Sequence, residues 1–223
     1  SWQGTGNTKE HFPQAMSIYE GIEEQVAAAG DQVTLSLEGE YKNTPDVAIV
    51  VFGEDPYAEF QGDRPHLDFQ SEAGLALLNK FKAQGIPTVA VFLSGRPMWM
   101  NPEINAADAF VAAWLPGSEG GGIADVLLRS GKDEIQQDFR GKLSFSWPRT
   151  AVQTLNPGDQ DYNPLFAYGF GLTYSDSGEL ESLSEDAQLG DKAQTQGLSF
   201  LKAGEAVSPW RLVMRDSAGT VQV

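Results

Sequence analysis

An apolar run leads directly into an acidic loop in the sequence Val47-Ala-Ile-Val-Val-Phe-Gly-Glu-Asp-Pro-Tyr-Ala-Glu-Phe-Gln-Gly-Asp63. Residues 47–52 are apolar at every position, which is typical of a strand in a parallel sheet that is covered on both faces. The acidic segment therefore leaves the carboxyl end of a buried strand. Because open α/β sheets bind ligands at that edge, we expect residues 53–63 to line a functional site.

Helices and strands alternate along the rest of the chain. Apolar spacing predicts helices at 15–29, 73–82, 102–107 and 123–129, and strands at 33–37, 47–52, 87–93, 109–113 and 142–147. This order predicts a flavodoxin-like α/β sandwich, with a mainly parallel sheet sandwiched by helices. The loops at 53–63, 94–97 and 114–122 then meet at one edge of the sheet.

The composition restricts the classes of partner. The chain carries 31 acidic and 15 basic residues, and its net charge of -16 disfavours nucleic acid and anionic membranes. It contains no cysteine, which excludes disulfides, thiolate metal sites and cysteine nucleophiles. No apolar segment approaches the roughly 20 residues of a membrane-spanning helix. We therefore expect no membrane span.

The composition changes after residue 174. Residues 175–196 are polar and acidic, which predicts a linker. Apolar segments at 198–201 and 210–215 predict strands, but they are too few for a β-sandwich. We therefore interpret 1–174 as the sandwich domain and 197–223 as the start of a C-terminal β domain, an incomplete β segment.

Three carboxylates lie on the acidic loop, at Glu54, Glu59 and Asp63. The neighbouring rings of Tyr57 and Phe60 would partly desolvate such an acid and raise its pKa, which suits a proton donor. Glu54 and Asp63 also have structural interpretations, because a carboxylate beside a strand end or a glycine often binds backbone amides or caps a turn. The residues alone do not choose among the three.

Other motifs support weaker interpretations. Arg96, in Ser94-Gly95-Arg96-Pro97, is expected to pair with a carboxylate of a neighbouring loop. The glycine cluster at 117–122 lacks a nucleotide-binding fingerprint, so it indicates close backbone packing. His11 and His66 show no metal-ligand spacing, and we predict neither a metal nor a cofactor. Trp2, in a polar loop, offers a flat apolar face that a pyranose ring can cover.

Several of these motifs, in this order, resemble the second, α/β-sandwich domain of glycoside hydrolase family 3. The resemblance covers residues 1–174, and the segment after the linker is similar to the extra C-terminal β domain of some marine bacterial exo-1,3/1,4-β-glucanases. The matching residues are Trp2-Gln3-Gly4, Gly53-Glu54-Asp55-Pro56-Tyr57-Ala58-Glu59 with Gly62-Asp63, Ser94-Gly95-Arg96-Pro97, Ala112-Ala113-Trp114-Leu115-Pro116-Gly117-Ser118-Glu119-Gly120, and Pro164-Leu165-Phe166 with Gly169-Phe170-Gly171-Leu172-Thr173-Tyr174.

The resemblance implies a retaining mechanism that is shared by two domains. An N-terminal (β/α)8 barrel supplies an aspartate nucleophile, and the sandwich domain supplies a glutamate as general acid/base. In the motif G-E-x-P-Y-x-E that glutamate is the last one, here Glu59. Trp2 matches a tryptophan that stacks on the sugar in the +1 subsite, and Glu54, Asp63 and Arg96 are then supporting residues.

The resemblance also implies a β-glucan oligosaccharide or β-glucoside substrate, exo-acting release of terminal β-D-glucosyl residues, and a periplasmic or secreted location. The barrel, the nucleophile motif and the first strand of the sandwich are expected to lie outside these 223 residues. Because retaining hydrolysis needs two carboxyl groups about 5–5.5 Å apart, we predict that residues 1–223 alone are inactive.

Two other functions stay open. The chain fits a non-catalytic carbohydrate-binding or scaffold domain, in which Trp2 and the loops at the sheet edge hold sugar without cleaving it. A flavodoxin-like nucleotide binder is the other, although the sequence lacks the glycine fingerprint of that class.

Overall fold

The computed structural model of the chain divides into two compact units, Ser1–Leu189 and Gly190–Val223. The structure describes residues 8–57, 60, 62–176 and 178–189, together with the strand pairing of 201–202, 205–206, 213–216 and 219–222. The first unit contains the predicted alternation of helices and strands.

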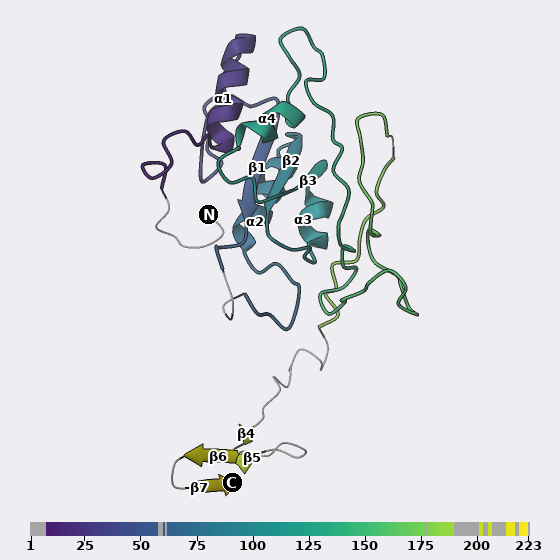
Figure 1. The fold of residues 1–223 in the computed structure, drawn as a ribbon. Helices are drawn as coiled ribbons and strands as arrows, with labels where there is room; N and C mark the ends of the chain where they lie inside the picture. Colours follow the sequence, from purple (N-terminus) through teal and green to yellow (C-terminus); the bar gives the residue numbers. More distant parts are fainter. Residues whose placement is uncertain are drawn as a thin grey trace. The chain divides into compact units, whose positions relative to one another are not determined.

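Three parallel strands form the sheet of the first unit (Figure 1). They are β1 (Ala48–Gly53), β2 (Thr88–Leu93) and β3 (Ala109–Trp114), in the spatial order β1-β2-β3. The register pairs Ala48 with Thr88 and Ala90 with Phe110. Continuous apolar runs therefore form parallel strands, and the predicted α/β fold class is confirmed.

The helices lie close to the predicted positions. They are α1 (Ile18–Ala29), α2 (Glu72–Ala83), α3 (Asn101–Ala106) and α4 (Gly121–Leu127). α1 begins three residues later than expected because Ser17 and Glu20 form a capping box at its first turn. It ends at Gly30, whose φ of 87° suits the left-handed conformation of a helix C-cap.

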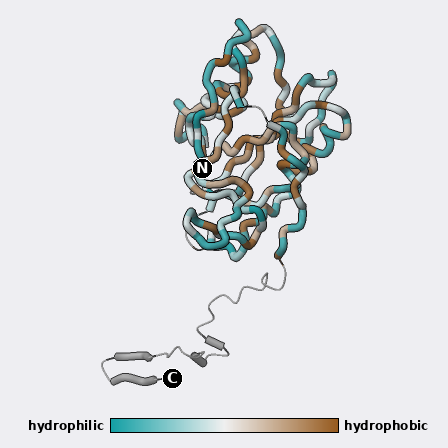
Figure 2. Tube along the Cα trace, turned by 90° about the vertical axis from the view of Figure 1, so that its right-hand side faces the viewer, coloured by the Kyte–Doolittle hydropathy of each residue, from teal (hydrophilic) through white to brown (hydrophobic). Residues whose placement is uncertain are grey.

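One face of the sheet packs against α2 and α3 and holds most of the core. Two clusters of buried apolar residues meet there, and aromatic rings join them through Phe52, Phe92 and Phe110. Figure 2 shows hydrophobic segments in the middle of the first unit and hydrophilic segments around them. This packing fixes the three strand ends that carry the candidate site.

Two predicted strands, 33–37 and 142–147, do not form. No strand among the described residues pairs with 33–37, and Leu35 and Leu37 are 62% and 83% exposed. At 142–147 only the ends pair with the chain at 165–170, and Phe145 between them is exposed. Apolar alternation predicts an extended segment, but it does not say whether a neighbouring strand is present.

The glycine cluster at 117–122 packs backbone against backbone, as predicted. A Cβ added at Gly120 would lie 2.4 Å from the backbone nitrogen of Ile18, at the start of α1. A Cβ added at Gly21 would lie 2.6 Å from the Cα of Gly121. The two helices therefore approach more closely than any residue with a side chain permits.

Gly21→Ala is expected to destabilise the chain by about 1–3 kcal/mol, because the new methyl group meets backbone rather than a flexible side chain. Gly122→Ala is the matched control, since a Cβ there meets nothing within 4 Å and alanine favours a helix by about 0.5–1 kcal/mol. Urea unfolding of the two variants checks the prediction. Equal stability of both would contradict the close approach of α1 and α4.

Residues 183 and 184 of the described segment 178–189 are hydrogen-bonded to α3. The Asn105 side chain donates to the carbonyl of Leu183 at 2.9 Å and accepts from the Leu183 N–H at 2.9 Å. Asn101 donates to the carbonyl of Ser184 at 2.8 Å. Because these bonds go to backbone groups, the segment is held independently of most of its side chains.

Between these two asparagines, Glu103 is buried and only 5% exposed. Burial is the main cause that raises the pKa of Glu103 from its ordinary 4.5 to about 7, and the charge of Glu185 contributes to this rise. The native state therefore holds this proton more tightly than the unfolded chain does.

The Glu103 contribution to stability is expected to be complete below pH 4.5 and to be lost as the pH rises to about 7. The loss amounts to about 3 kcal/mol for a shift of this size. Glu103→Gln should remove this pH dependence. The difference in unfolding free energy between the variant and the original chain should therefore change between pH 4.5 and about pH 7. A difference that is constant from pH 4 to pH 8 would contradict the prediction.

The second unit contains two short antiparallel pairs. β4 (Leu201–Lys202) pairs with β5 (Glu205–Ala206), and β6 (Val213–Asp216) pairs with β7 (Gly219–Gln222). The predicted strands at 198–201 and 210–215 overlap β4 and β6, and residues 198–200 and 210–212 lie outside the described part. Within the described part of the chain, every helix is too short or too polar to cross a bilayer.

Candidate active site at the carboxyl edge of the sheet

The candidate site forms where the three parallel strands end. Gly53 closes β1, and a Cβ there would lie 2.2 Å from the carbonyl oxygen of Leu93, so only glycine lets the two strand ends approach this closely. The N–H of Ser94, after β2, donates to the carbonyl of Trp114 at the end of β3. As predicted, the loops after the strands lie at one edge of the sheet.

Glu54 is the centre of the contacts at this edge. It directly follows β1, and its side chain is 8% exposed. Arg96 donates to its carboxylate from Nη2 at 2.6 Å and from Nε at 3.1 Å, and the Ser94 hydroxyl donates at 2.6 Å. The sequence predicted that Arg96 pairs across loops, and the structure confirms Glu54 as its partner. Such a two-pronged pair fixes both position and orientation.

Arg96 also binds the far end of the acidic loop. Its Nη1 donates to the carbonyl of Gly62 at 2.6 Å, and its guanidinium lies 4.3 Å from the centre of the Tyr57 ring. One guanidinium therefore contacts the loop at its start, on its aromatic side chain and near its end. A cation over an aromatic face adds attraction to these hydrogen bonds.

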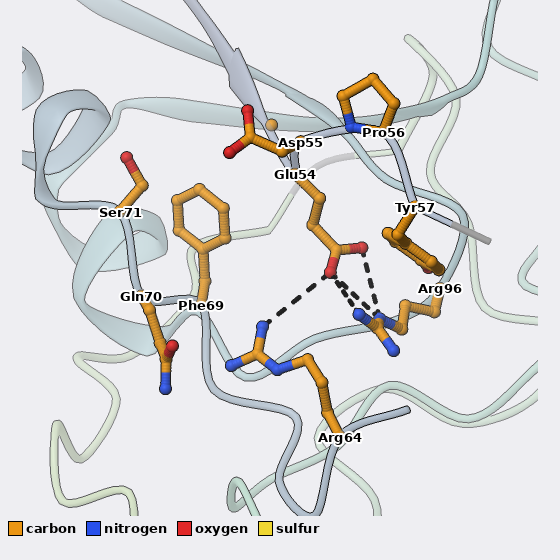
Figure 3. A pocket seen from close by; sticks show the side chains of 10 residues that line it. Glu54, Asp55, Pro56, Tyr57, Arg64, Phe69, Gln70, Ser71 and Arg96 are labelled. Carbon is orange, nitrogen blue, oxygen red and sulfur yellow. Dashed lines mark hydrogen bonds and ion pairs between the residues drawn. The ribbon is translucent and has the colours of Figure 1, made fainter. Parts of the chain in front are cut away.

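Arg64 provides a second positive charge. Its Nη1 lies 3.9 Å from the Glu54 carboxylate, and its Nη2 donates to the Asp68 carbonyl at 2.7 Å. Sequence reasoning did not identify Arg64, because it follows Glu54 by ten residues and shares no motif with it. Figure 3 shows the Glu54 carboxylate between the two guanidinium groups.

A cleft of about 340 Å³ lies over this cluster. Asp55 points away from the two arginines (Figure 3). Burial raises the pKa of the Tyr57 hydroxyl, and the Glu54 charge adds to the effect, so Tyr57 stays a hydrogen-bond donor at neutral pH. The lining residues are Gly53, Glu54, Asp55, Pro56, Tyr57, Arg64, Phe69, Gln70, Ser71 and Arg96.

The five predicted site residues have different outcomes. Glu54 and Arg96 lie together, and Glu59 and Trp2 lie outside the residues that the structure describes. Asp63 takes part in a turn, because its N–H donates to the carbonyl of Phe60 at 3.2 Å, and it is exposed. Its carboxylate does not join the Glu54 cluster.

The hydrogen bonds of the Glu54 carboxylate give this residue a structural role. Both carboxylate oxygens of Glu54 accept hydrogen bonds from Arg96 or Ser94, so Glu54 serves the loop as an anchor. Beyond the anchor, Phe60 has a φ of 69° and is 87% exposed. A bulky residue rarely adopts this conformation, and such strain tends to occur at functional sites.

Comparison with known proteins identifies relatives of this chain. Residues 1–174 match the model of the glycosyl hydrolase family 3 C-terminal domain. A lysosomal β-glucosidase from Dictyostelium discoideum is 29% identical over 198 residues, which cover 78% of this chain and 23% of that protein. A periplasmic β-glucosidase from Salmonella typhimurium is 32% identical over 155 residues, which cover 58% of this chain and 19% of that protein.

Solved structures show the same likeness. The crystal structure of an exo-1,3/1,4-β-glucanase from a Pseudoalteromonas species is 60% identical, with a TM-score of 0.81 over 83% of this chain and 24% of that chain. A β-glucosidase from Listeria innocua is 22% identical with a TM-score of 0.54, which shows a shared fold. The chain therefore spans about a quarter or less of the length of the glucanase and of the two β-glucosidases above.

Proposed function

The chain belongs to glycosyl hydrolase family 3, as its C-terminal domain, and we propose from this membership that it is part of a retaining, exo-acting β-glucosidase or β-glucanase. The parent protein hydrolyses terminal β-D-glucosyl residues of β-glucan oligosaccharides or β-glucosides. The observation that carries the proposal is the 60% identity to a protein that is an exo-1,3/1,4-β-glucanase by name.

In this proposal the two carboxyl groups of the reaction come from different domains. Glu59 is the general acid/base, and it occupies the last position of the motif that begins at Gly53 and Glu54. An aspartate from an N-terminal (β/α)8 barrel is the nucleophile. Because the pair must stand about 5–5.5 Å apart across the anomeric carbon, neither domain hydrolyses substrate alone.

The geometry of Arg96 supports this assignment. The guanidinium holds the loop at Glu54 before residue 59 and at Gly62 after it. A proton donor must be held within a few tenths of an ångström to act efficiently, and two-sided anchoring of its loop provides this restraint. Glu54 and Arg96 are therefore supporting residues that position the loop, and Asp63 supports its turn.

Substrate contact is assigned to Trp2. An indole face covers a pyranose ring without a specific hydrogen-bond pattern, as a +1 subsite requires. We propose the domain division into 1–174 as the sandwich, 175–196 as the acidic linker and 197–223 as the start of a β domain. We also propose a periplasmic or secreted location, in line with the name of the Salmonella typhimurium relative.

Glu59→Gln in the parent protein tests the assignment, because it removes the proton donor and keeps the size of the side chain. The other candidate function, a non-catalytic carbohydrate-binding domain, requires unchanged turnover in that variant. Release of glucose by the 223-residue chain alone would contradict a mechanism shared with a barrel.

A further inference from the structure

Arg64 lies between two carboxylates of the candidate site. Its Nη2 donates to the carbonyl of Asp68 at 2.7 Å and lies 3.5 Å from the Asp68 carboxylate. Its Nη1 lies 3.9 Å from Oε1 of Glu54, and it approaches that carboxylate from the side opposite Arg96 (Figure 3). The Arg64 side chain is 21% exposed, so most of it is removed from solvent.

The chain around Asp68 is fixed to the core. Trp99, after β2, exchanges two backbone hydrogen bonds with the residues on either side of Asp68, at 2.6 and 3.2 Å. The neighbouring Phe69 ring packs edge-on against Phe92, with ring centres 5.2 Å apart. Because these contacts hold Asp68 in place, it is a fixed partner for the Arg64 guanidinium.

The pair of Glu54 and Arg64 joins the two limbs of the acidic loop. Glu54 opens the loop after β1, and Arg64 lies on the return limb, residues 62–66. In the sequence, position 59 is five residues from each of them. A contact between two points of a chain restricts the conformations of the residues between them. The pair therefore restrains the loop from within, whereas Arg96 holds it from the loop after β2.

The charges of Glu54, Asp68, Arg64 and Arg96 balance. At 3.9 Å the contact between Arg64 and Glu54 is an ion pair rather than a hydrogen bond. The Glu54 side chain is 8% exposed, so salt and water screen this pair only weakly. Without Arg64, two carboxylates would face one guanidinium, and the return limb would lose its attraction to Glu54.

We propose that Arg64 is a further positioning residue of the hydrolytic reaction. By joining Glu54 at the start of the acidic loop to Asp68 behind it, Arg64 holds the proton donor in the geometry that transfer to the leaving group requires. It acts through Glu59 rather than on the substrate. The inference rests on the proposed function, because it needs Glu59 to be the general acid/base.

Arg64→Met in the parent protein, measured with two substrates, tests this role. kcat on an unactivated β-glucan oligosaccharide should fall about tenfold or more, because a proton donor displaced by about 1 Å transfers poorly. KM should change by less than about threefold, since substrate binding is not affected. The burst of aryl alcohol from an aryl glucoside with an acidic leaving group should keep nearly its original rate, because that step needs little protonation.

The ratio of the two rates is the readout that a purely structural role would not move. A variant that was only less stable would lose both rates equally, because less folded enzyme would be present. Equal losses on the two substrates would therefore overturn the proposal.

Arg129→Met is the matched control. Arg129 also donates to the carbonyl of the residue four positions later, Asp133, at 3.1 Å and lies 3.5 Å from its carboxylate. It is 58% exposed and does not line the cleft over Glu54, so both rates should stay unchanged. An Arg64→Met variant that behaved like this control would also overturn the proposal.

Arg64→Lys keeps the positive charge and protects the test against a variant that does not fold. Lysine is a compact point charge that cannot contact Asp68 and Glu54 together, so we expect a smaller loss that still spares the aryl glucoside. Glu59→Gln in the same assay separates this inference from the proposed function. If only the Glu59 variant is impaired on the oligosaccharide, the proposed function stands and Arg64 has no part in it. If the Glu59 variant is normal, both proposals are wrong.

Discussion

Glu59→Gln in the parent protein is expected to lower kcat on an unactivated β-glucan oligosaccharide by about 10²–10⁴-fold. The leaving alcohol of such a substrate is a poor leaving group and needs a proton in the transition state. Glutamine keeps the length of the side chain but has no proton to give. The affinity for a non-hydrolysable sugar should stay within a few-fold of the original, because the change affects transfer of a proton rather than sugar binding.

The dependence on the leaving group makes the test specific. An aryl glucoside with an acidic leaving group needs little protonation, so the variant should form the glycosyl-enzyme at a nearly normal rate. Hydrolysis of this intermediate should be slower, because it needs the general base. Added azide should restore turnover, because it attacks the glycosyl-enzyme without a general base. Glu24→Gln, an exposed acid on α1, is the control and should leave all rates unchanged. Normal turnover of the oligosaccharide by the Glu59 variant would remove it from the mechanism.

Local patterns predicted the parts of the fold that depend on local burial. Residues 47–52 and 87–93 are apolar throughout because parallel strands are covered on both faces, and both form strands. Residues 33–37 have a strand pattern, yet they pair with no strand in the part of the chain that the structure describes, since pairing depends on residues far away in the chain. A sequence pattern records which face of an element is apolar, and it does not record what covers that face.

The site was predictable to the same extent. Arg96 stands in a short motif at a strand end, so its pairing with a carboxylate of another loop followed from topology. Which carboxylate pairs with Arg96 did not follow, because Glu54, Glu59 and Asp63 lie on one loop. The sequence does not show that Glu54 is buried and Asp63 exposed. Arg64 reaches Glu54 through the path of the loop between them, which no spacing rule describes.

The contacts of the acidic segment after residue 174 could not be predicted from the sequence either. Its polarity predicts an extended, solvated chain, and no regular secondary structure forms in its described residues through 189. Its backbone, however, is bound by Asn101 and Asn105 of α3. Because the asparagines bind backbone groups, the composition of the bound segment does not indicate this contact. Only the structure reveals it.

Arg96→Met is expected to lower the unfolding free energy of the 223-residue chain by about 3–5 kcal/mol, the usual cost of leaving one partner of a buried ion pair uncompensated. The Glu54 side chain is 8% exposed, and its carboxylate would lose the charged contacts from Nη2 and Nε, while Arg64 at 3.9 Å replaces little of that attraction. Urea unfolding followed by tryptophan fluorescence measures the loss.

The matched control is Arg129→Met, which removes an arginine from an exposed pair with Asp133 and should change stability by less than about 0.5 kcal/mol. The double variant Glu54→Gln with Arg96→Met should regain part of the loss, because no buried charge is then left without a partner. If Arg96→Met alone were as mild as the control, the loop would not depend on this guanidinium. Its start at Glu54 and its end at Gly62 would then be held by backbone packing at the strand ends, and Arg96 would not be the residue that positions Glu59, the proposed acid/base.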